Sequence, residues 1–467
     1  MKARELHNLG IPKGPAMKLA QRIIARAAKN GMSKQEFRQI VGDVADSPED
    51  HTDDAVWGEL ALALIDSAAA RTTFVPRDEP APWRQWGRDL EAGAVGQLEA
   101  ASRLPVAVCG ALMPDAHIGY GLPIGGVLAT DNAVIPFAVG MDIACRMKMS
   151  VLDMPVSAIG GQTDRLKNTL QRETCFGVGG GFRGNNRRQH DVLDEDWSIS
   201  PITRKNKDKA WAQLASSGSG NHFAEFGVLT LDHDELGLAA GEYLALLSHS
   251  GSRGVGGMIA QHYSKLAMEL HPELPRDLIS LAWFDLDTQP GQEYWAAMEL
   301  MGRYAAASHE LIHRYVARNL GAKVLADVEN HHNFAWKENH GGRDLIVHRK
   351  GATPAEAGVL GLIPGSMATP CYVVRGKGCP ESLNSASHGA GRRMSRKKAK
   401  QTFTWSDINR FLKQRKVELM SAGLDEAPMA YKDIEEVMRA QQDLVEPIAR
   451  FDPRLVKMAP GGERPED

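Results

Sequence analysis

Long hydrophobic runs are what this sequence most clearly lacks. Its 467 residues contain no stretch of 18 or more apolar residues, and the first ten (MKARELHNLG) have no apolar core. A membrane-spanning helix needs about 20 mostly apolar residues, and a secretory signal needs an apolar segment near the start. We therefore expect a cytoplasmic protein with no membrane partner.

A cysteine framework and an excess of positive charge are absent as well. No CxxC pair occurs, and the odd number of cysteines fits free thiols in a reducing compartment. The formal net charge of −3 argues against a uniformly basic surface, so a polyanion would have to bind local patches. The cysteines, one of which is a candidate metal ligand, are Cys109, Cys145, Cys175, Cys371 and Cys379.

The order of patterns along the chain predicts an α+β protein with a helical N-terminal module. Apolar residues recur at helical spacing from 18 to 70, and the proline-rich segment PRDEPAP follows. Short apolar runs (Val106–Leu112, Gly126–Leu128, Ala133–Val139) then alternate with turns, and helical spacing returns near 256–270, 290–320 and 405–421. We predict a module at 1–75, a linker at 76–84, a mixed α/β domain at 85–458 and a flexible tail at 459–467.

Potential metal ligands occur in several short clusters. Asp142 and Cys145 stand three residues apart in VGMDIAC, a spacing that brings both side chains together in a turn but not in a straight strand. His222 in GSGNHFAE and His249 in SHSGSRGVG lie in glycine-rich turns, whose free amides bind anions. Taken singly, each is more often structural than functional.

A fourth cluster contains the adjacent histidines His331 and His332, and spacing does not choose between them, because only one faces a given site in extended backbone. If the fold brings these clusters together, one thiolate, one carboxylate and several imidazoles would suffice for one or two metal sites. Ligand softness alone favours zinc.

His388 lies in a glycine-flanked turn, SASHGAG, directly before a basic segment. Six cations fall between Arg392 and Lys400, which would place a nucleophilic or acid-base imidazole beside a polyphosphate or an RNA backbone. The alternative is a solvated helix face. The glycine-rich segment at 177–184 (GVGGGFRG) lacks the Lys-Ser/Thr ending of a P-loop and is typical of a flexible loop, so we assign it no role.

Nine segments, in this order, resemble those of the RtcB family of RNA ligases. The resemblance runs from about residue 85 to Lys457 and leaves out the N-terminal module. Because there are nine such segments and they occur in the same order, the resemblance is far more specific than any single motif. The segments are MPDAHIGYGLPIGG, VGMDIAC, GSGNHFAE, SHSGSRGVG, HHNF, HRKGATPA, IPGSMATP, SASHGAGRRMSR and DEAPMAYKDIEEVM.

The resemblance implies an RtcB-type mixed α/β catalytic domain that holds two Mn²⁺ ions. By the family pattern, Cys145 would bridge both ions, Asp142 and His222 would complete one site, and His249 and His332 the other. His331 would then be a bystander. Availability of the metal in the cell, as well as ligand softness, decides which ion occupies such a site, so manganese replaces the zinc that softness alone favours.

The resemblance further implies GTP-dependent joining of an RNA 3′-phosphate or 2′,3′-cyclic phosphate to a 5′-hydroxyl, as in tRNA splicing and RNA repair. His388, oriented by Asp115, would become guanylylated and pass GMP to the RNA through an RNA-3′-pp-5′-G intermediate. An archease-like protein would be an activating partner. Arg253, Lys350 and Arg392 would contact RNA phosphates. The guanylate would be held by Asn221, His222, Phe223, Ala224, Glu225, His332, Asn333, Pro364, Gly365, Ser366, Met367, Cys371, His388, Gly389, Ala390, Gly391 and Lys457.

Two positions depart from the family pattern. Arg146 follows Cys145 where glycine is common, which puts a bulky cation near the predicted metal ions, and Cys371 stands where serine is common. Two alternatives therefore stay open: a diverged paralog that only caps or processes 3′-phosphate ends, and a non-catalytic RNA-binding protein of the same fold. The complete set of ligands together with the nucleophile disfavours the second.

Overall fold

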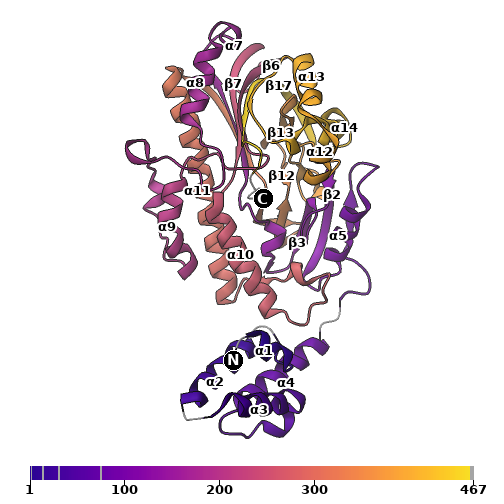
Figure 1. Ribbon diagram of the computed structural model, residues 1–467. Coiled ribbons are helices and arrows are strands. Elements are labelled where there is room, and N and C mark those ends of the chain that lie inside the picture. Colours follow the sequence, from indigo (N-terminus) through magenta and orange to yellow (C-terminus); the bar gives the residue numbers. More distant parts are fainter. Residues whose placement is uncertain (2, 13–14, 30–31, 74–75, 463–467) are drawn as a thin grey trace.

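The computed structural model describes residues 1, 3–12, 15–29, 32–73 and 76–462, and shows a small helical module next to a larger domain of helices and sheets (Figure 1). The mixed α+β fold and the helical module are as the sequence predicted. The tail prediction falls largely on residues 463–467, which lie outside the described residues. The helices of the module are α1 (Ala3–Asn8), α2 (Pro15–Lys29), α3 (Lys34–Asp46) and α4 (Gly58–Thr73).

The module has its own hydrophobic core and a well-defined helix start. Ser33 caps α3 by accepting from the Glu36 amide, while the Glu36 carboxylate accepts from the Ser33 amide, so two otherwise unpaired amides are satisfied. Ile24, Phe37 and Trp57 are buried together between the helices. An ion pair of 3.0 Å joins Lys18 to Glu269 of the larger domain, but the lysine is 69% exposed, so this pair adds little stability.

The proline-rich segment after the module lies along the larger domain. Residues 76–82 form no helix or strand, yet the amides of Arg77 and Ala81 donate to the carbonyls of Arg103 and Ser102 at 2.9 and 2.8 Å. The last two residues of the predicted linker belong to a strand. Sequence reasoning placed them outside the domain because pairing with a distant strand leaves no local signal.

A five-stranded sheet forms one part of the larger domain, in the order β1-β2-β3-β11-β10. The pair β1 and β2 is parallel and the others are antiparallel. Its strands are β1 (Trp83–Gln85), β2 (Ala107–His117), β3 (Ile124–Thr130), β10 (Phe334–His340) and β11 (Arg343–Lys350).

An eight-stranded sheet forms the other part, in the order β13-β14-β17-β6-β7-β5-β9, with β16 pairing β17. Asn330 of β9 bonds through its side chain to both backbone groups of Leu362 on β13, so the two edge strands of the curled sheet meet. The strands are β5 (Arg146–Leu152), β6 (Phe223–Leu231), β7 (Gly241–Ser250), β9 (Val324–His331), β13 (Leu360–Ser366), β14 (Thr369–Gly376), β16 (Glu418–Ser421) and β17 (Val445–Met458). Two short pairs are β4 (Ala133–Val134) with β8 (Phe284–Asp285) and β12 (Ala352–Pro354) with β15 (Ser385–Ser387).

Helices cover the large sheet. Leu166 and Val316, from α8 and α11, pack with Phe226 and Leu244 of β6 and β7. Figure 1 shows α8 to α11 on one side of the domain and α12 to α14 on the other. The helices are α5 (Ala92–Ser102), α6 (Pro136–Val139), α7 (Ala158–Gly161), α8 (Thr163–Glu173), α9 (Pro201–Gln213), α10 (Arg253–Leu270), α11 (Gln289–Leu320), α12 (Arg396–Thr402), α13 (Trp405–Arg415) and α14 (Ile434–Arg439).

The helices predicted near 256–270 and 290–320 are present as α10 and α11. The pattern at 405–421 was wrong in its second half, because α13 ends at Arg415, Lys416 takes a left-handed conformation (φ +58°), and β16 follows. The run Ala133–Val139 likewise divides into β4 and the short helix α6, which begins at Pro136. None of the described helices is long and apolar enough to cross a membrane.

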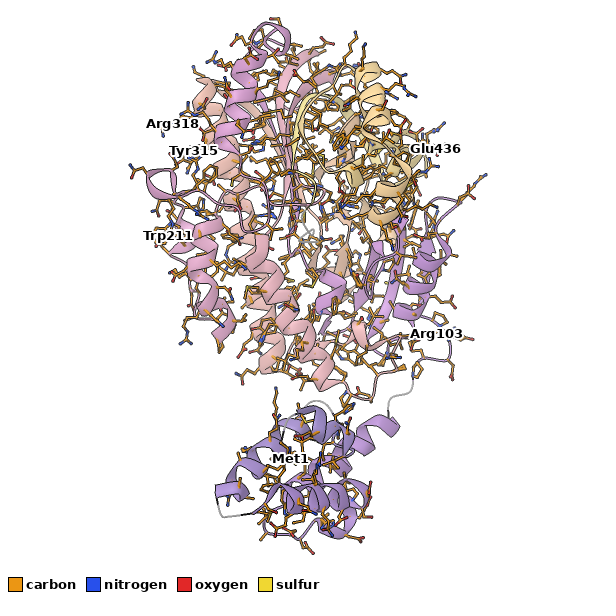
Figure 2. The ribbon with its side chains drawn as sticks, in the orientation of Figure 1. Met1, Arg103, Trp211, Tyr315, Arg318 and Glu436 are labelled. Atoms are coloured by element: carbon orange, nitrogen blue, oxygen red, sulfur yellow. The ribbon has the colours of Figure 1, made fainter. Side chains whose placement is uncertain are left out.

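The glycine-rich segment at 177–184 leads into a loop that is fixed on the helical side of the domain. The Arg187 guanidinium lies 3.5 Å from the ring centroid of Trp211, and that of Arg188 lies 3.6 Å from the centroid of Tyr315. Figure 2 labels both aromatic residues on this side. Each contact is a cation–π interaction, worth about 0.5–2 kcal/mol, so the loop is held against α9 and α11.

Candidate active site

Asp142 and Cys145 lie in a tight turn between α6 and β5. Ala144 adopts a left-handed conformation (φ +55°), and its amide donates to the Asn333 carbonyl at 2.8 Å. The turn brings the Asp142 carboxylate and the Cys145 thiol into one group with His222, whose ligand atoms lie within 4.8 Å of one another. Asp142 and Cys145 therefore face the same group of side chains, as their three-residue spacing predicts for a turn.

His222 is held between Asp142 and Arg253. Its Nε2 atom lies 3.0 Å from Asp142 Oδ2 and 3.4 Å from Cys145 Sγ, while the Arg253 guanidinium donates to Nδ1 at 3.1 Å. Burial, the largest influence on Asp142, would raise its pKa, but contacts with His222 and Arg253 outweigh burial and lower the pKa to about 2. Asp142 is therefore a carboxylate at neutral pH.

Two glycines permit this close packing. A Cβ atom at Gly251 would lie 2.2 Å from both carboxylate oxygens of Asp142. One at Gly218, where φ is +89°, would lie 1.8 Å from Nη1 of Arg253. The glycines in the motifs GSGNHFAE and SHSGSRGVG thus make room for the charged groups beside His222.

Cys145 also belongs to a second group, with His249 and His332. His249 Nε2 lies 3.1 Å from Cys145 Sγ and 3.2 Å from His332 Nε2, and its Nδ1 donates to the Asn221 carbonyl at 3.3 Å. That hydrogen bond leaves the lone pair on Nε2. Burial lowers the pKa of His249 to about 3 and that of His332 well below its usual value, so both rings are neutral, as metal ligands must be.

Strand pairing decides between the two adjacent histidines. His331 is opposite Arg146 in the β5–β9 ladder, and its ring packs 5.0 Å from that of Trp336. The next residue leaves the strand, and the His332 amide donates to the Cys145 carbonyl at 2.9 Å. His332 therefore faces the thiol, which sequence spacing could not establish.

The donor atoms of the two groups fit divalent cations. The side chains of all five residues (Asp142, Cys145, His222, His249 and His332) are buried. His332 Nδ1 has no hydrogen-bond partner among the described residues, and buried polar atoms without partners are costly unless something satisfies them. Cys145 is the one residue common to the two groups.

His388 stands next to this cluster, with its ring centroid 4.9 Å from that of His332. It follows β15, and its Nδ1 donates to Asp115 Oδ2 at 2.7 Å. Asp115, on β2, is fully buried, whereas His388 is 17% exposed. The carboxylate fixes the proton on Nδ1 and leaves the Nε2 lone pair for reaction.

Lys432 supports Asp115 and was missed in the sequence. Its Nζ donates to the carbonyls of Pro114 and Ala116 at 3.0 and 2.8 Å, so it holds the backbone on both sides of Asp115. The lysine lies in the segment DEAPMAYKDIEEVM, but no local spacing connects it to β2. Gly391 also packs there, because a Cβ atom on it would lie 2.0 Å from the Asp115 carbonyl oxygen.

The residues predicted to hold the guanylate come together on neighbouring strands and turns. Cys371 is opposite Pro364 and Lys457 is opposite Ala224 in the sheet, and the Ala390 amide donates to the Pro364 carbonyl at 2.9 Å. These residues lie along β6, β13, β14, β15 and β17 or in the turns next to them: Asn221, Phe223, Ala224, Glu225, Pro364, Gly365, Ser366, Met367, Cys371, His388, Gly389, Ala390, Gly391 and Lys457. Asn333 lies at the metal-ligand turn, where its side chain donates to the Asp142 carbonyl and accepts from the Gly351 amide.

Two of these residues have buried acidic groups. Burial raises the pKa of Glu225 well above its usual value, and burial together with Glu225 does the same for the Cys371 thiol. Cys371 packs within the core of the large sheet. A neutral Glu225 carboxyl can both donate and accept a hydrogen bond, whereas the thiol is a poor partner for a polar ligand.

Glu225 predicts a pH dependence of stability. Because the folded chain keeps this proton where the unfolded chain has lost it, the free energy of unfolding should fall as pH rises from about 4.5 toward the raised pKa, by roughly 1.4 kcal/mol per pH unit. Glu225→Gln cannot lose a proton, so its stability relative to the wild type should grow over that interval and not below it. Urea unfolding at several pH values measures this, and equal slopes for both proteins would contradict it.

The cations predicted to contact RNA are engaged within the protein. Arg253 bonds to His222, Arg392 donates to the Asp425 carbonyl at 2.7 Å, and Lys350 donates to the carbonyls of Phe137, at 2.9 Å, and Tyr120. Burial lowers the pKa of Lys350 to about 7 and that of Lys457 to about 8. These cations therefore bond to other groups of the protein. The sequence did not predict these internal bonds, because it gives no measure of burial.

Arg146 lies beside Cys145 and forms an ion pair with the neighbouring strand. Its guanidinium pairs with Glu329 of β9 at 3.2 Å, and Arg146 itself is 6% exposed. The cation is thus neutralised across the sheet. The cation that the sequence placed near the predicted metal ligands is therefore present, because Arg146 interacts electrostatically with Cys145 while it pairs with Glu329.

A buried hydrogen-bonded chain supports β7 from behind the cluster. The Ser248 hydroxyl lies 2.9 Å from His309 Nδ1 and 2.8 Å from His313 Nε2, and His309 Nε2 donates to the Ser250 carbonyl at 3.1 Å. Burial lowers the pKa of both histidines well below the usual value. These hydrogen bonds fix Ser248 and Ser250, the two residues that flank His249. The sequence did not indicate them, because a serine on β7 and two histidines on α11 form no recognisable motif.

Clustered metal ligands beside a carboxylate-oriented histidine are the arrangement of an enzyme rather than of a simple binding module. The chain matches the family described as "tRNA-splicing ligase RtcB" over residues 97–200 and 195–458. This match covers most of the larger domain and all the site residues described above. The chain belongs to the RtcB family of RNA ligases.

Individual relatives extend over most of the chain. The RNA-splicing ligase RtcB of Escherichia coli (strain K12) is 33% identical over 409 residues, which cover 79% of this chain and 95% of the relative. The tRNA-splicing ligase RtcB of Nanoarchaeum equitans is 31% identical over 421 residues, with 74% and 87% covered. That of Thermococcus kodakarensis is 29% identical over 419 residues, with 73% and 86% covered.

Proposed function

We propose that this protein joins an RNA 3′-phosphate or 2′,3′-cyclic phosphate to a 5′-hydroxyl, with GTP as co-substrate and Mn²⁺ as cofactor, through a guanylylated His388. The observation that carries the proposal is the hydrogen bond of 2.7 Å between His388 Nδ1 and Asp115, beside a cluster able to hold metal ions. An imidazole so oriented presents Nε2 as a nucleophile of fixed direction.

His388 begins the reaction with GTP. Its Nε2 lone pair attacks the α-phosphorus, the N–P bond forms, and the bond to the bridging oxygen breaks as pyrophosphate leaves. Asp115 holds the Nδ1 proton and stabilises the positive charge on the ring. An oxygen of the RNA 3′-phosphate then attacks the same phosphorus, which returns the electron pair to Nε2 and gives RNA-3′-pp-5′-G. A 2′,3′-cyclic phosphate is first opened by water, which breaks the bond to the 2′-oxygen and leaves the 3′-phosphate. The 5′-hydroxyl finally attacks the RNA phosphorus, loses its proton to solvent and expels GMP as the new P–O bond forms.

The metal ions would be held by Cys145 as the common ligand, by Asp142 and His222 on one side, and by His249 and His332 on the other. When bound, they neutralise phosphate oxygens during transfer. The buried Glu225 carboxyl suits the guanine base, because burial favours its neutral form, which can donate one hydrogen bond and accept another. The fixed ring of His388 supplies the direction of attack.

Incubation with Mn²⁺ and α-labelled GTP tests the proposal. We expect label on the protein that survives denaturation and is released by acid, because a phosphoramidate bond is acid-labile. Absence of label, with and without added RNA, would reject both the ligase and a capping enzyme. A γ-labelled GTP sample is the control, since its label leaves with pyrophosphate.

An assay with RNA strands of defined end groups then distinguishes ligation from capping. We expect RNA that carries a 2′,3′-cyclic phosphate or a 3′-phosphate to be joined to a strand with a 5′-hydroxyl. Accumulation of RNA-3′-pp-5′-G without joined product would instead identify an enzyme that only caps 3′-phosphate ends. A strand with a 5′-phosphate in place of the 5′-hydroxyl should give no joined product.

A further inference from the structure

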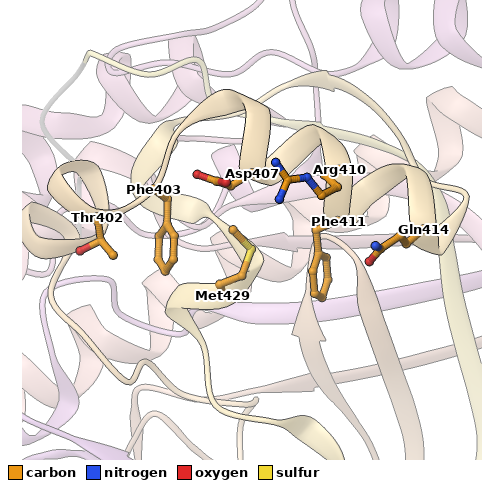
Figure 3. Close-up of a pocket in the computed structure, with 7 residues that line it drawn as sticks. All are labelled: Thr402, Phe403, Asp407, Arg410, Phe411, Gln414 and Met429. Carbon is orange, nitrogen blue, oxygen red and sulfur yellow. The ribbon is translucent and has the colours of Figure 1, made fainter.

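A surface cavity of about 430 Å³ lies between α12, α13 and the turn that contains Met429 (Figure 3). Its volume is within the range of about 300–1,000 Å³ typical of small-ligand sites. We call it the α12–α13 pocket, and the residues that define it are Thr402, Phe403, Asp407, Arg410, Phe411, Gln414 and Met429. None of them belongs to the proposed catalytic machinery.

One stripe of α13 faces the pocket. Asp407, Arg410, Phe411 and Gln414 stand at positions i, i+3, i+4 and i+7, which share one face of a helix. Ile408, from another face, is fully buried against the large sheet. The helix is therefore anchored by its apolar side and presents a mixed aromatic and polar stripe to the cavity.

Aromatic surface lines the pocket from two directions. Phe403 and Phe411 are partly buried, and each packs against the core beneath α13 while also lining the cavity. Trp405, at the start of α13, is 44% exposed, which is unusual for so large an apolar side chain. Flat rings supported from behind are stacking platforms for a planar ligand.

The segment around the pocket is strongly basic in a chain of net charge −3. Ten of the 25 residues from Arg392 to Lys416 are Arg or Lys, and the single acidic residue, Asp407, is occupied by the Thr404 amide and hydroxyl at 3.0 and 2.7 Å. Lys397, Lys398, Arg410 and Lys413 are exposed. Such a local excess of positive charge complements a polyanion.

We propose that the α12–α13 pocket binds an unpaired base of the RNA substrate, stacked against Phe403 or Phe411, while the exposed cations bind the adjacent phosphates. Arg410 and Gln414 supply hydrogen bonds to the base edge. Aromatic rings and a guanidinium in one cavity are the means by which proteins recognise single-stranded RNA. Along the chain, the basic segment begins four residues after His388. This inference rests on the proposed function, in which RNA ends are the substrate.

Photo-cross-linking tests the pocket without catalysis. The full-length protein is irradiated with single-stranded RNA that ends in a 3′-phosphate and carries 5-iodouridine at unpaired positions, in the absence of GTP. We expect the cross-links to form at Phe403 or Phe411, which line the pocket. Cross-links confined to other segments would overturn the proposal, whatever the outcome of the labelling with GTP.

Kinetics of two variants test the same pocket during ligation. Arg410→Ala and Phe411→Leu should each raise KM for RNA by about tenfold, with the rate of guanylylation by GTP unchanged. Leucine keeps the apolar contact beneath α13 and removes only the aromatic face. Arg318→Ala, an exposed arginine on α11, is the matched control and should leave KM unchanged. An unchanged KM for RNA in both pocket variants would overturn the proposal.

Discussion

His388→Ala should take up no label from α-labelled GTP, while the folded protein and its metal content stay as in the wild type. The substitution removes the only atom, Nε2, that the proposal uses to form the covalent bond, and alanine offers no substitute. We expect guanylylation and ligation to fall by at least roughly 10³-fold. Because His388 is partly exposed and lies outside the two ligand groups, its loss should disturb the buried ligands little.

The variant Asp115→Asn distinguishes the orientation of the His388 ring from the formation of the bond between His388 and GMP. The amide keeps the size of the carboxylate but no longer offers a full charge to the Nδ1 proton 2.7 Å away, so the ring loses part of its preference for one tautomer. We expect guanylylation to slow by about 10–100-fold without disappearing. His233→Ala, at an exposed histidine, is the control for both variants. Labelling of His388→Ala at the wild-type rate would contradict the proposed nucleophile, and a wild-type rate in Asp115→Asn would remove the orienting role.

Cys145→Ala should abolish high-affinity Mn²⁺ binding. Its sulfur belongs to both ligand groups, so one substitution removes a ligand from each at the same time. We expect the affinity for Mn²⁺ to fall by at least roughly 100-fold, and the rise in melting temperature on adding Mn²⁺ to vanish, because a ligand stabilises a fold only as far as it binds. Equilibrium dialysis with metal analysis measures the first effect, and thermal unfolding with and without Mn²⁺ measures the second.

Cys371→Ala is the matched control for the metal experiment. Its thiol is equally buried but packs in the core of the large sheet and belongs to neither ligand group. This variant should lose some stability, because it leaves a small cavity, yet keep its affinity for Mn²⁺. Retained Mn²⁺ binding in Cys145→Ala, or equal losses in the two cysteine variants, would contradict a bridging role for Cys145.

Local patterns in the sequence determined much of the secondary structure. The helical spacing near 290–320 became α11, because that helix starts at a threonine cap before a proline and ends at a glycine, Gly321, in the left-handed conformation. The pattern at 405–421 misled because β16 depends on parallel pairing with β17, a contact distant in the chain. The local sequence of a short segment does not indicate whether it pairs with a strand far away in the chain.

The sequence by itself determined the family, through nine ordered motifs, and the residue types from which a site could be built. Spacing in the sequence did not decide that Asp142, Cys145, His222 and His249 converge, or that His332 rather than His331 joins them. The family resemblance implied this set of residues, and the tertiary structure brings them together. It also revealed Lys432 behind Asp115, the internal bonding of Arg253 and Lys350, and the α12–α13 pocket. The physical reason is that ligand geometry and burial depend on strand register and on packing between distant segments, whereas sequence spacing reports only neighbours along the chain.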